Sequence, residues 1–277
     1  MRIMFWNTHR NTKINEYIVN LIQDYDIDVF VMAEYFADAN ELKVLLERNH
    51  QRFFPCCTEG CSRIVVWSNY ASIEPGCQNT YHSIQIIKDK YILCCVHLMS
   101  DRHGDRSEER FEKIQEIMYD IKQTEQSINS QRTIIIGDFN EMPYDKGCLN
   151  ANGFHGLPVL DIMDKPTRRV YKTDYRKFYN PMWNLMGDFL SPPGTYYLNQ
   201  SKLYSPMWYM LDQVIVSKDI LPLFKKESLS IVTSCSYSDL MDGSQHPNKK
   251  ISDHFPIMCE IEDTERYDGG KVVYAAN

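Results

Sequence analysis

The chain has 277 residues, of which 43% are hydrophobic, and its formal net charge is −7 at pH 7. This composition predicts a globular protein with a substantial core and excludes a disordered chain. No apolar run approaches the roughly 20 residues that a membrane-spanning helix needs. The negative net charge argues against a protein that binds long nucleic acid over its whole surface. No secretion signal is visible at the start, so the nine cysteines are expected to be reduced thiols of a cytoplasmic protein.

The first half of the chain is predicted to contain buried strands and amphipathic helices. Residues 13–24 carry apolar side chains at i, i+3, i+4, i+7 and i+8, which predicts a helix. A shorter helix is expected at residues 41–48. Strands are predicted at 2–7, 28–33, 63–67, 83–87 and 91–98, with turn-like breaks such as Glu74-Pro75-Gly76 between them.

The second half is predicted to continue with a long helix at residues 107–123, a strand that leads to Asp138, and strands at 209–216, 230–233 and 255–261. No repeat and no linker is evident, so we expect a single domain over residues 1–263 and a flexible tail over residues 264–277. Many short strands without strict alternation with helices predict an α+β sandwich of two sheets, with helices outside.

The most informative segment is residues 132–143, with the sequence R-T-I-I-I-G-D-F-N-E-M-P. The β-branched run before Gly137 is typical of a strand buried on both faces. Asp138 and Asn140 follow two residues apart, so their side chains can point to the same side. An Asx turn explains such a pair in many proteins. A buried carboxylate nevertheless needs a metal, a histidine or hydrogen bonds to compensate its charge.

Polar residues recur at the ends of the predicted apolar strands. Asp212 is notable because it interrupts an apolar strand pattern and therefore needs a charged or hydrogen-bonding partner. Each single case has an ordinary explanation as a turn, a cap or a core histidine. The whole set is difficult to attribute to turns: Asn7, Glu34, His97, Asp138, Asn140, Asp212, Asp253 and His254.

These residues lie in short motifs whose order resembles the endonuclease/exonuclease/phosphatase superfamily. The motifs are Trp6-Asn7, Ala33-Glu34, His97-Leu98, Gly137-Asp138-Phe139-Asn140, Leu211-Asp212-Gln213-Val214 and Ser252-Asp253-His254-Phe255-Pro256. They span nearly the whole chain. The superfamily includes deoxyribonuclease I, AP endonucleases, neutral sphingomyelinases and inositol polyphosphate 5-phosphatases. The resemblance implies a four-layer α-β-β-α sandwich of the deoxyribonuclease I type, and hydrolysis of a phosphoester that depends on Mg²⁺ or Mn²⁺.

The residue types at the motifs suit a magnesium site. Mg²⁺ prefers oxygen ligands and keeps several waters, so one or two carboxylates and the substrate phosphate suffice. Glu34 is the predicted principal ligand, with Asn7 beside it and Asp253 or Asp138 completing the shell. The metal would polarise the phosphate and offset charge on the leaving oxygen.

The remaining motif residues are predicted to be catalytic. Asp138 and Asn140 would hold the attacking water in line with the phosphorus. His254, oriented by Asp212, could act as a general base or, if protonated, stabilise charge on the phosphoryl oxygens. Both roles stay open, because an Asp–His pair raises the pKa of the imidazole. By resemblance, His97 would bind the scissile phosphate.

The substrate is less constrained by the sequence. Residues 165–177 hold six basic residues and one acid, and an aromatic-rich segment follows. Cations interleaved with aromatics suit a nucleic acid or nucleotide substrate, so Arg168, Arg169, Lys172 and Arg176 are predicted to bind it, although a solvated basic loop explains them equally well. A nuclease acting on DNA or RNA is the first hypothesis. The alternatives are a phosphatase or phospholipase-C-type enzyme on a small phosphoester, inositol phosphate or phospholipid headgroup, and a catalytically silent binding module. No protein partner is predicted.

Overall fold

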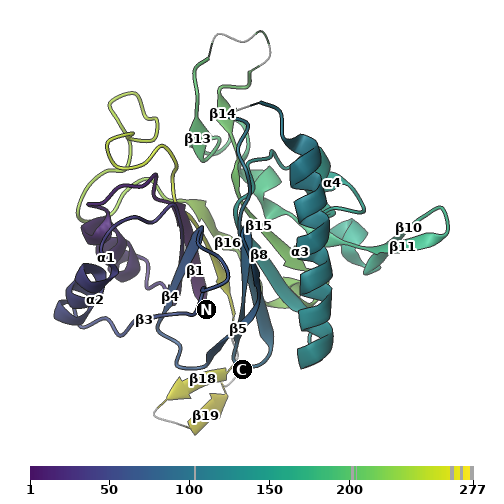
Figure 1. Cartoon of the computed structure of the whole chain (residues 1–277), viewed down its shortest axis with the longest axis horizontal. Helices are drawn as coiled ribbons and strands as arrows, with labels where there is room; N and C mark the ends of the chain where they lie inside the picture. Colours follow the sequence, from purple (N-terminus) through teal and green to yellow (C-terminus); the bar gives the residue numbers. More distant parts are fainter. Residues whose placement is uncertain (103, 201–202, 204, 263–264, 269–270, 275–277) are drawn as a thin grey trace.

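A computed structural model describes residues 1–102, 104–200, 203, 205–262, 265–268 and 271–274. Its centre is a pair of large sheets packed face to face (Figure 1). The strands of the first sheet lie in the order β16 (Phe224–Ile231), β17 (Ile257–Ile261), β1 (Arg2–Asn7), β2 (Val29–Ala33), β4 (Ile64–Ser68) and β3 (Phe54–Pro55). β1 is parallel to β2 and antiparallel to β17, so the beginning of the chain lies inside this sheet.

The second sheet has the order β5 (Ile73–Asn79), β6 (His82–Ile87), β7 (Tyr91–His97), β8 (Arg132–Asp138), β15 (Asp212–Ser217), β12 (Phe178–Tyr179) and β9 (Gly156–Leu157). β7 and β8 are parallel, and the long helix α3 (Ser107–Ile128) is the crossover between them. The central strands β7 and β15 are buried along their whole length, and β8 is buried from Thr133 onward.

Helices cover the outer face of each sheet. α1 (Asn15–Asp24) and α2 (Ala39–Arg48) lie against the first sheet, and α3 and the short α4 (Lys146–Leu149) lie on the side of the second (Figure 1). Within the described residues, the connections contain three short 3₁₀ helices, η1 (Asp161–Met163), η2 (Pro181–Leu185) and η3 (Lys218–Leu223). They also contain the hairpins β10 (Thr167–Val170) with β11 (Thr173–Arg176) and β13 (Tyr196–Tyr197) with β14 (Trp208–Tyr209).

Three apolar clusters correspond to the three interfaces between these layers. Alternate strand residues such as Phe5, Val31 and Ile136 fill the space between the sheets. Their sequence neighbours point the other way: Trp6 and Met32 pack against α1 and α2, and Ile135 packs against α3. This period of two on strands buried on both faces gives the predicted four-layer α-β-β-α sandwich, which is confirmed.

Most predicted elements are present with boundaries shifted by a few residues. The segment Glu74-Pro75-Gly76 was expected to be a break between strands, and this prediction is wrong: it lies inside β5. Proline is tolerated there because β5 is an edge strand and its register against β6 shifts between Pro75 and Gln78. The predicted strand at 209–216 is divided between β14 and β15, and 230–233 is the end of the longer β16.

The sheets share one core, which supports our proposal that residues 1–263 form a single domain. The expected flexible tail over 264–277 falls partly on residues 264, 269–270 and 275–277, which lie outside the described residues. Between them, β18 (Glu265–Asp268) and β19 (Lys271–Tyr274) pair as an antiparallel hairpin. In the described part of the chain, no helix combines the length and the apolar character that crossing a membrane requires.

Candidate functional site

A row of polar side chains closes one end of the core between the sheets. His97 of β7 is in register with Asp138 of β8, and Asp138 is in register with Asp212 of β15. Side chains two residues apart on a strand share a face. Ile134 and Ile136 point into the core between the sheets, so Asp138 points to the same side. The same alternation applies to β7 and β15, and it places the three polar residues side by side at the end of the apolar core.

The strand end at Asp138 has a closely constrained backbone. A Cβ atom on Gly137 would lie 1.9 Å from the carbonyl oxygen of Val96, so only glycine fits against β7 at this point. Asn140 has a positive φ of 49°. Its backbone N–H donates to Asp138 Oδ1 at 2.9 Å, and its side-chain amide donates to the carbonyl of Leu98 at 3.0 Å. The predicted Asx turn is therefore present, and it also fixes the orientation of the Asp138 carboxylate.

The first sheet contributes Asn7 and Glu34 to this cluster. Asn7, at the end of β1, donates from Nδ2 to Asp138 Oδ2 at 3.0 Å, which joins the two sheets. Glu34 follows β2 with a φ of 50°, and its carbonyl accepts hydrogen bonds from Thr8 Oγ1 at 2.9 Å and from the Arg10 N–H at 3.0 Å. Its carboxylate lies 3.8 Å from His97 Nε2 and 3.2 Å from Arg10 Nε.

The segment before β17 supplies the remaining predicted residues. His254 Nδ1 donates to Asp212 Oδ2 at 2.8 Å, and both residues are buried. Trp6 holds the loop in place by donating from Nε1 to the His254 carbonyl at 2.9 Å. Asp253 lies at the edge of the cluster. Its oxygens are 2.9 Å from His9 Nδ1, 4.0 Å from His254 Nε2 and 3.9 Å from the Arg102 guanidinium.

Burial and neighbouring charges give the titratable groups different protonation states. Burial raises the pKa of Asp138 to about 7, although the positive charge of His254 opposes this shift. Burial alone would lower the pKa of His254, but the carboxylate of Asp212 outweighs it and raises the pKa to about 10. Burial lowers the pKa of His97 to about 4, with a further contribution from Arg63. At neutral pH, His254 is therefore a cation and His97 is neutral.

The four basic residues that were predicted to bind substrate do not lie at this cluster. Arg168, Arg169, Lys172 and Arg176 belong to the β10–β11 hairpin, which projects away from the sheets (Figure 1). Arg176 forms an ion pair with Glu125 and donates to the carbonyl of Gln131, just before β8 begins. Asp138, at the other end of β8, is seven residues beyond Gln131, or about 23 Å.

The β13–β14 hairpin lies beside the cluster instead. It extends from the end of the sheets that carries Asp138 and Asp212 (Figure 1). The ring of Tyr196 lies 4.8 Å from the His254 ring, and Tyr197 is stacked on His246 at 3.5 Å. Tyr196 and Tyr197 belong to the aromatic-rich segment that is predicted to contact bases together with the basic residues. In the structure, these aromatic residues lie at the cluster and the four basic residues do not.

Sequence reasoning missed three side chains with basic groups at the edge of the cluster. His9 contacts Asp253, Arg10 contacts Glu34, and the Arg102 guanidinium lies near Asp253. The signal available for the first two was their position directly after the Trp6-Asn7 motif. Arg102 lies in the loop after β7, where no pattern distinguishes it from a solvated residue.

Comparison with known proteins gives matches at the level of structure alone. No protein-family model matches the chain, and no curated protein sequence matches it. The 3'-5' exonuclease NExo from Neisseria meningitidis superposes with a TM-score of 0.57 and 13% identity, covering 95% of this chain and 100% of that one. D. rerio TDP2 complexed with single-strand DNA product has a TM-score of 0.56 and 15% identity, covering 95% and 99% of the two chains.

An AP endonuclease from Archaeoglobus fulgidus matches with a TM-score of 0.56 and 9% identity, covering 95% of this chain and 100% of that chain. All three matches extend over nearly the full length of both proteins. At these identities, the similarity demonstrates a common fold.

Proposed function

Because this chain has the fold of the endonuclease/exonuclease/phosphatase superfamily, we propose that it is a metal-dependent phosphoesterase that hydrolyses phosphodiester bonds in nucleic acid. The observation that carries the proposal is the cluster at the end of the core between the sheets. It brings together Asn7, His97, Asp138, Asp212 and His254 from motifs that are up to 247 residues apart in the chain. Buried acids and histidines at this density are typical of a catalytic site.

The charge balance of the cluster fits a bound divalent cation. Glu34, Asp138, Asp212 and Asp253 supply carboxylates, whereas His254 is the buried cation among the described residues of the cluster. In the same part of the chain, Asp212 Oδ1 is buried without a hydrogen-bond partner. Uncompensated buried carboxylates are costly, and oxygen donors of this kind match the preferences of Mg²⁺ or Mn²⁺.

We assign Glu34 and Asn7 to the metal, with Asp138 or Asp253 completing the shell. Glu34 retains 19% exposure of its side chain, which leaves room for water and substrate ligands. When bound, the cation polarises the phosphate and offsets negative charge on the leaving oxygen.

The protein groups then have distinct roles. Asp138, held by Asn7 and by the backbone N–H of Asn140, orients the attacking water and accepts its proton, a role that suits a carboxyl group with a pKa of about 7. Protonated His254 stabilises the charge on the phosphoryl oxygens, and Asp212 keeps it protonated. Of the two roles left open for His254, we therefore propose charge stabilisation. Neutral His97 can donate one hydrogen bond to the scissile phosphate.

Magnesium is expected to stabilise the protein more strongly as the pH rises through about 7. In the cation-free protein, the raised pKa of Asp138 makes the folded state retain a proton that the unfolded state loses, so this group's contribution to stability falls as the pH rises from about 4 to about 7. A bound cation stabilises the ionised carboxylate and thereby offsets this loss of stability. The Mg²⁺-induced rise in Tm should therefore be at least about 2 °C larger at pH 8 than at about pH 5.5.

This dependence is measured by thermal unfolding of chelator-treated protein with and without Mg²⁺ at both pH values. The Asp138→Asn variant is the matched control, because its side chain does not titrate. An equal Mg²⁺ effect at both pH values in the unmodified protein contradicts a role for Asp138 beside the cation.

Nucleic acid is the substrate class that we propose. One structural neighbour, D. rerio TDP2, holds a single-strand DNA product. In this chain, the aromatic side chains of the β13–β14 hairpin stand beside His254, and aromatic faces stack on bases without regard to sequence. A cytoplasmic location is part of the same proposal, because all nine cysteines are free thiols.

The decisive experiment is a cleavage screen in Mg²⁺ and in Mn²⁺. Single-stranded DNA, duplex DNA, RNA, bis-p-nitrophenyl phosphate and sphingomyelin are compared, with the Asp138→Asn protein as the blank for each. We expect metal-dependent cleavage of at least one nucleic acid. Turnover of a lipid or small phosphoester with all nucleic acids intact would select the alternative substrate class, and inactivity on every substrate would favour a silent binding module.

A further inference from the structure

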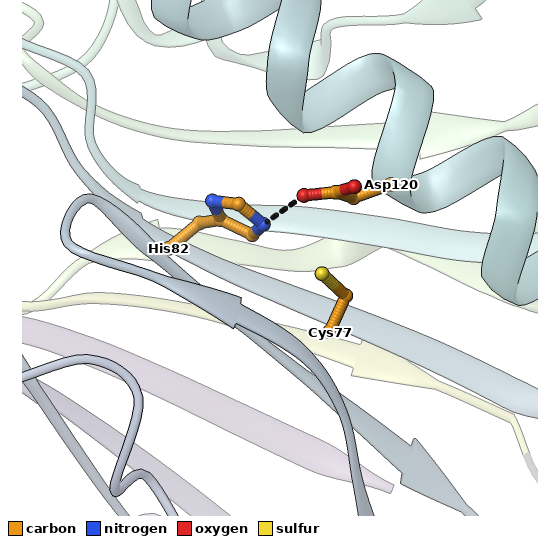
Figure 2. A group of neighbouring side chains, drawn as sticks. All are labelled: Cys77, His82 and Asp120. Carbon is orange, nitrogen blue, oxygen red and sulfur yellow. Dashed lines mark ion pairs between the residues drawn. The ribbon is translucent and has the colours of Figure 1, made fainter.

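A second group of potential metal ligands lies on the outer side of the second sheet, away from the cluster described above. It consists of Cys77 on β5, His82 at the start of β6 and Asp120 on α3 (Figure 2). Figure 2 shows the three side chains converging between the β5–β6 hairpin and the helix. One ligand atom from each lies within 4.8 Å of the other two.

The imidazole of His82 is the unusual member of this group. The residue is 1% exposed, and its Nε2 atom makes no hydrogen bond of acceptable geometry with any described residue. An oxygen of Asp120 nevertheless lies 3.1 Å from Nε2. The contact with Asp120 therefore leaves Nε2 without a well-formed hydrogen bond, and the Cys77 thiol lies on the same side of the ring (Figure 2). A buried imidazole nitrogen without a well-formed hydrogen bond is costly if the contact is purely structural.

We propose that Cys77, His82 and Asp120 bind a zinc ion, with water in the fourth position. Thiolate, imidazole and carboxylate are the ligand types of zinc, with bonds of about 2.0–2.3 Å, so ligand atoms of one tetrahedral ion lie about 3–4 Å apart. Nε2 and the Asp120 oxygen already have this spacing at 3.1 Å. The Cys77 sulfur needs to move at most about 1 Å closer to the other two ligand atoms, and a rotation of the Cys77 side chain allows this movement.

The protonation states are compatible with binding. Burial lowers the pKa of His82 despite the nearby charge of Asp120, so the ring is neutral and has a lone pair to give. Burial and the hydrogen bond to Asp120 raise the pKa of the Cys77 thiol to about 11. Zinc must therefore displace the thiol proton, and the affinity should increase with pH. Cys77 is exposed, which gives the ion a route to the group.

The proposed zinc ligands lie on one face of the second sheet. His97, Asp138 and Asp212 of the proposed phosphoesterase cluster lie on its other face. His82 is in register with Val96, which packs towards α3, whereas the next residue, His97, points between the sheets. A bound zinc would cross-link the β5–β6 hairpin to α3 through side chains that the phosphoester chemistry does not use. The proposal therefore stands independently of the proposed function.

Cobalt substitution tests the site, because a thiolate bound to Co²⁺ gives a charge-transfer band in the near ultraviolet. The phosphoesterase cluster contains no cysteine and cannot produce this band. We expect one equivalent of Co²⁺ to produce it in the full-length protein and Zn²⁺ to abolish it by displacement. The band should be lost in Cys77→Ser, and the Co²⁺ affinity should fall at least tenfold in Asp120→Asn.

Two controls should keep the band. Cys57→Ser removes another exposed thiol, from a residue whose carbonyl accepts a hydrogen bond from Gln78, next to Cys77. Asp138→Asn alters the other cluster. Circular dichroism verifies that each variant is folded. The proposal is overturned if the unmodified protein gives no thiolate band with Co²⁺, or if a folded Cys77→Ser protein keeps the band.

Discussion

Replacing Asp138 by asparagine is expected to lower kcat on the substrate identified by the screen by at least about a hundredfold. Asparagine has nearly the same shape and can still accept the hydrogen bond from Asn7 Nδ2. It cannot accept a proton from water or contribute negative charge to the metal. Burial raises the pKa of Asp138 to about 7 in the cation-free protein, and a bound cation favours the ionised carboxylate further, so the group can act as a base at neutral pH. The substitution removes that function while leaving the packing largely intact.

The measurement is steady-state kinetics at saturating Mg²⁺, so that a weaker metal affinity does not imitate a lower kcat. Asp161→Asn is a matched control, since Asp161 is an exposed residue of η1, and its kinetics should be unchanged. A folded Asp138→Asn protein with near-normal kcat contradicts the proposed site.

Replacing His254 by alanine is also expected to cost at least about a hundredfold in kcat, because it removes a preorganised positive charge from the phosphoryl oxygens. Asp212→Asn separates this role from a role as general base. Asp212 holds the pKa of His254 at about 10. Without that carboxylate the pKa falls, so the protonated form is lost at lower pH.

The pH–rate profile distinguishes the two roles. If protonated His254 is the active form, the alkaline limb of the profile should move to lower pH in Asp212→Asn. If neutral His254 were a general base, a lower pKa would instead extend activity towards acidic pH. His50→Ala, at an exposed position beyond α2, should leave the profile unchanged.

The composition of the site was predictable because strand alternation and polar residues are both readable in a sequence. Ile134 and Ile136 identify the face of β8 that enters the core, and Asp138 continues that face. The register that sets Asp138 between His97 and Asp212 is not encoded locally, and neither is the hydrogen bond from Asn7 across the two sheets. The motif resemblance supplied that long-range information.

The position of the basic segment could not be predicted from charge alone. Its location follows from β12, where Phe178 pairs with Ser217 at the end of β15 furthest from Asp212. That pairing fixes the preceding β10–β11 hairpin at the opposite end of the sheet from the cluster. Phe178 is fully buried, so apolar packing decides where the basic residues lie.

The group of Cys77, His82 and Asp120 was also beyond sequence reasoning. Its first two members are separated by a hairpin turn, and β5 was itself expected to contain a break at Pro75. Asp120 reaches the group only because α3 crosses the same sheet. Spacing along the chain therefore gave no pattern typical of zinc.

The pairing of β1 with β17 has a consequence for the protein during synthesis. Met4 faces Met258 and Phe5 faces Ile257 across these strands, so two neighbouring strands of the first sheet are about 250 residues apart in the chain. Contacts of such sequence separation form late. A nascent chain that still holds residues near 260 inside the ribosome cannot bring Asp253 and His254 beside Asn7 and Asp138. The proposed enzyme would therefore remain inactive until β17 has left the ribosome and has paired with β1.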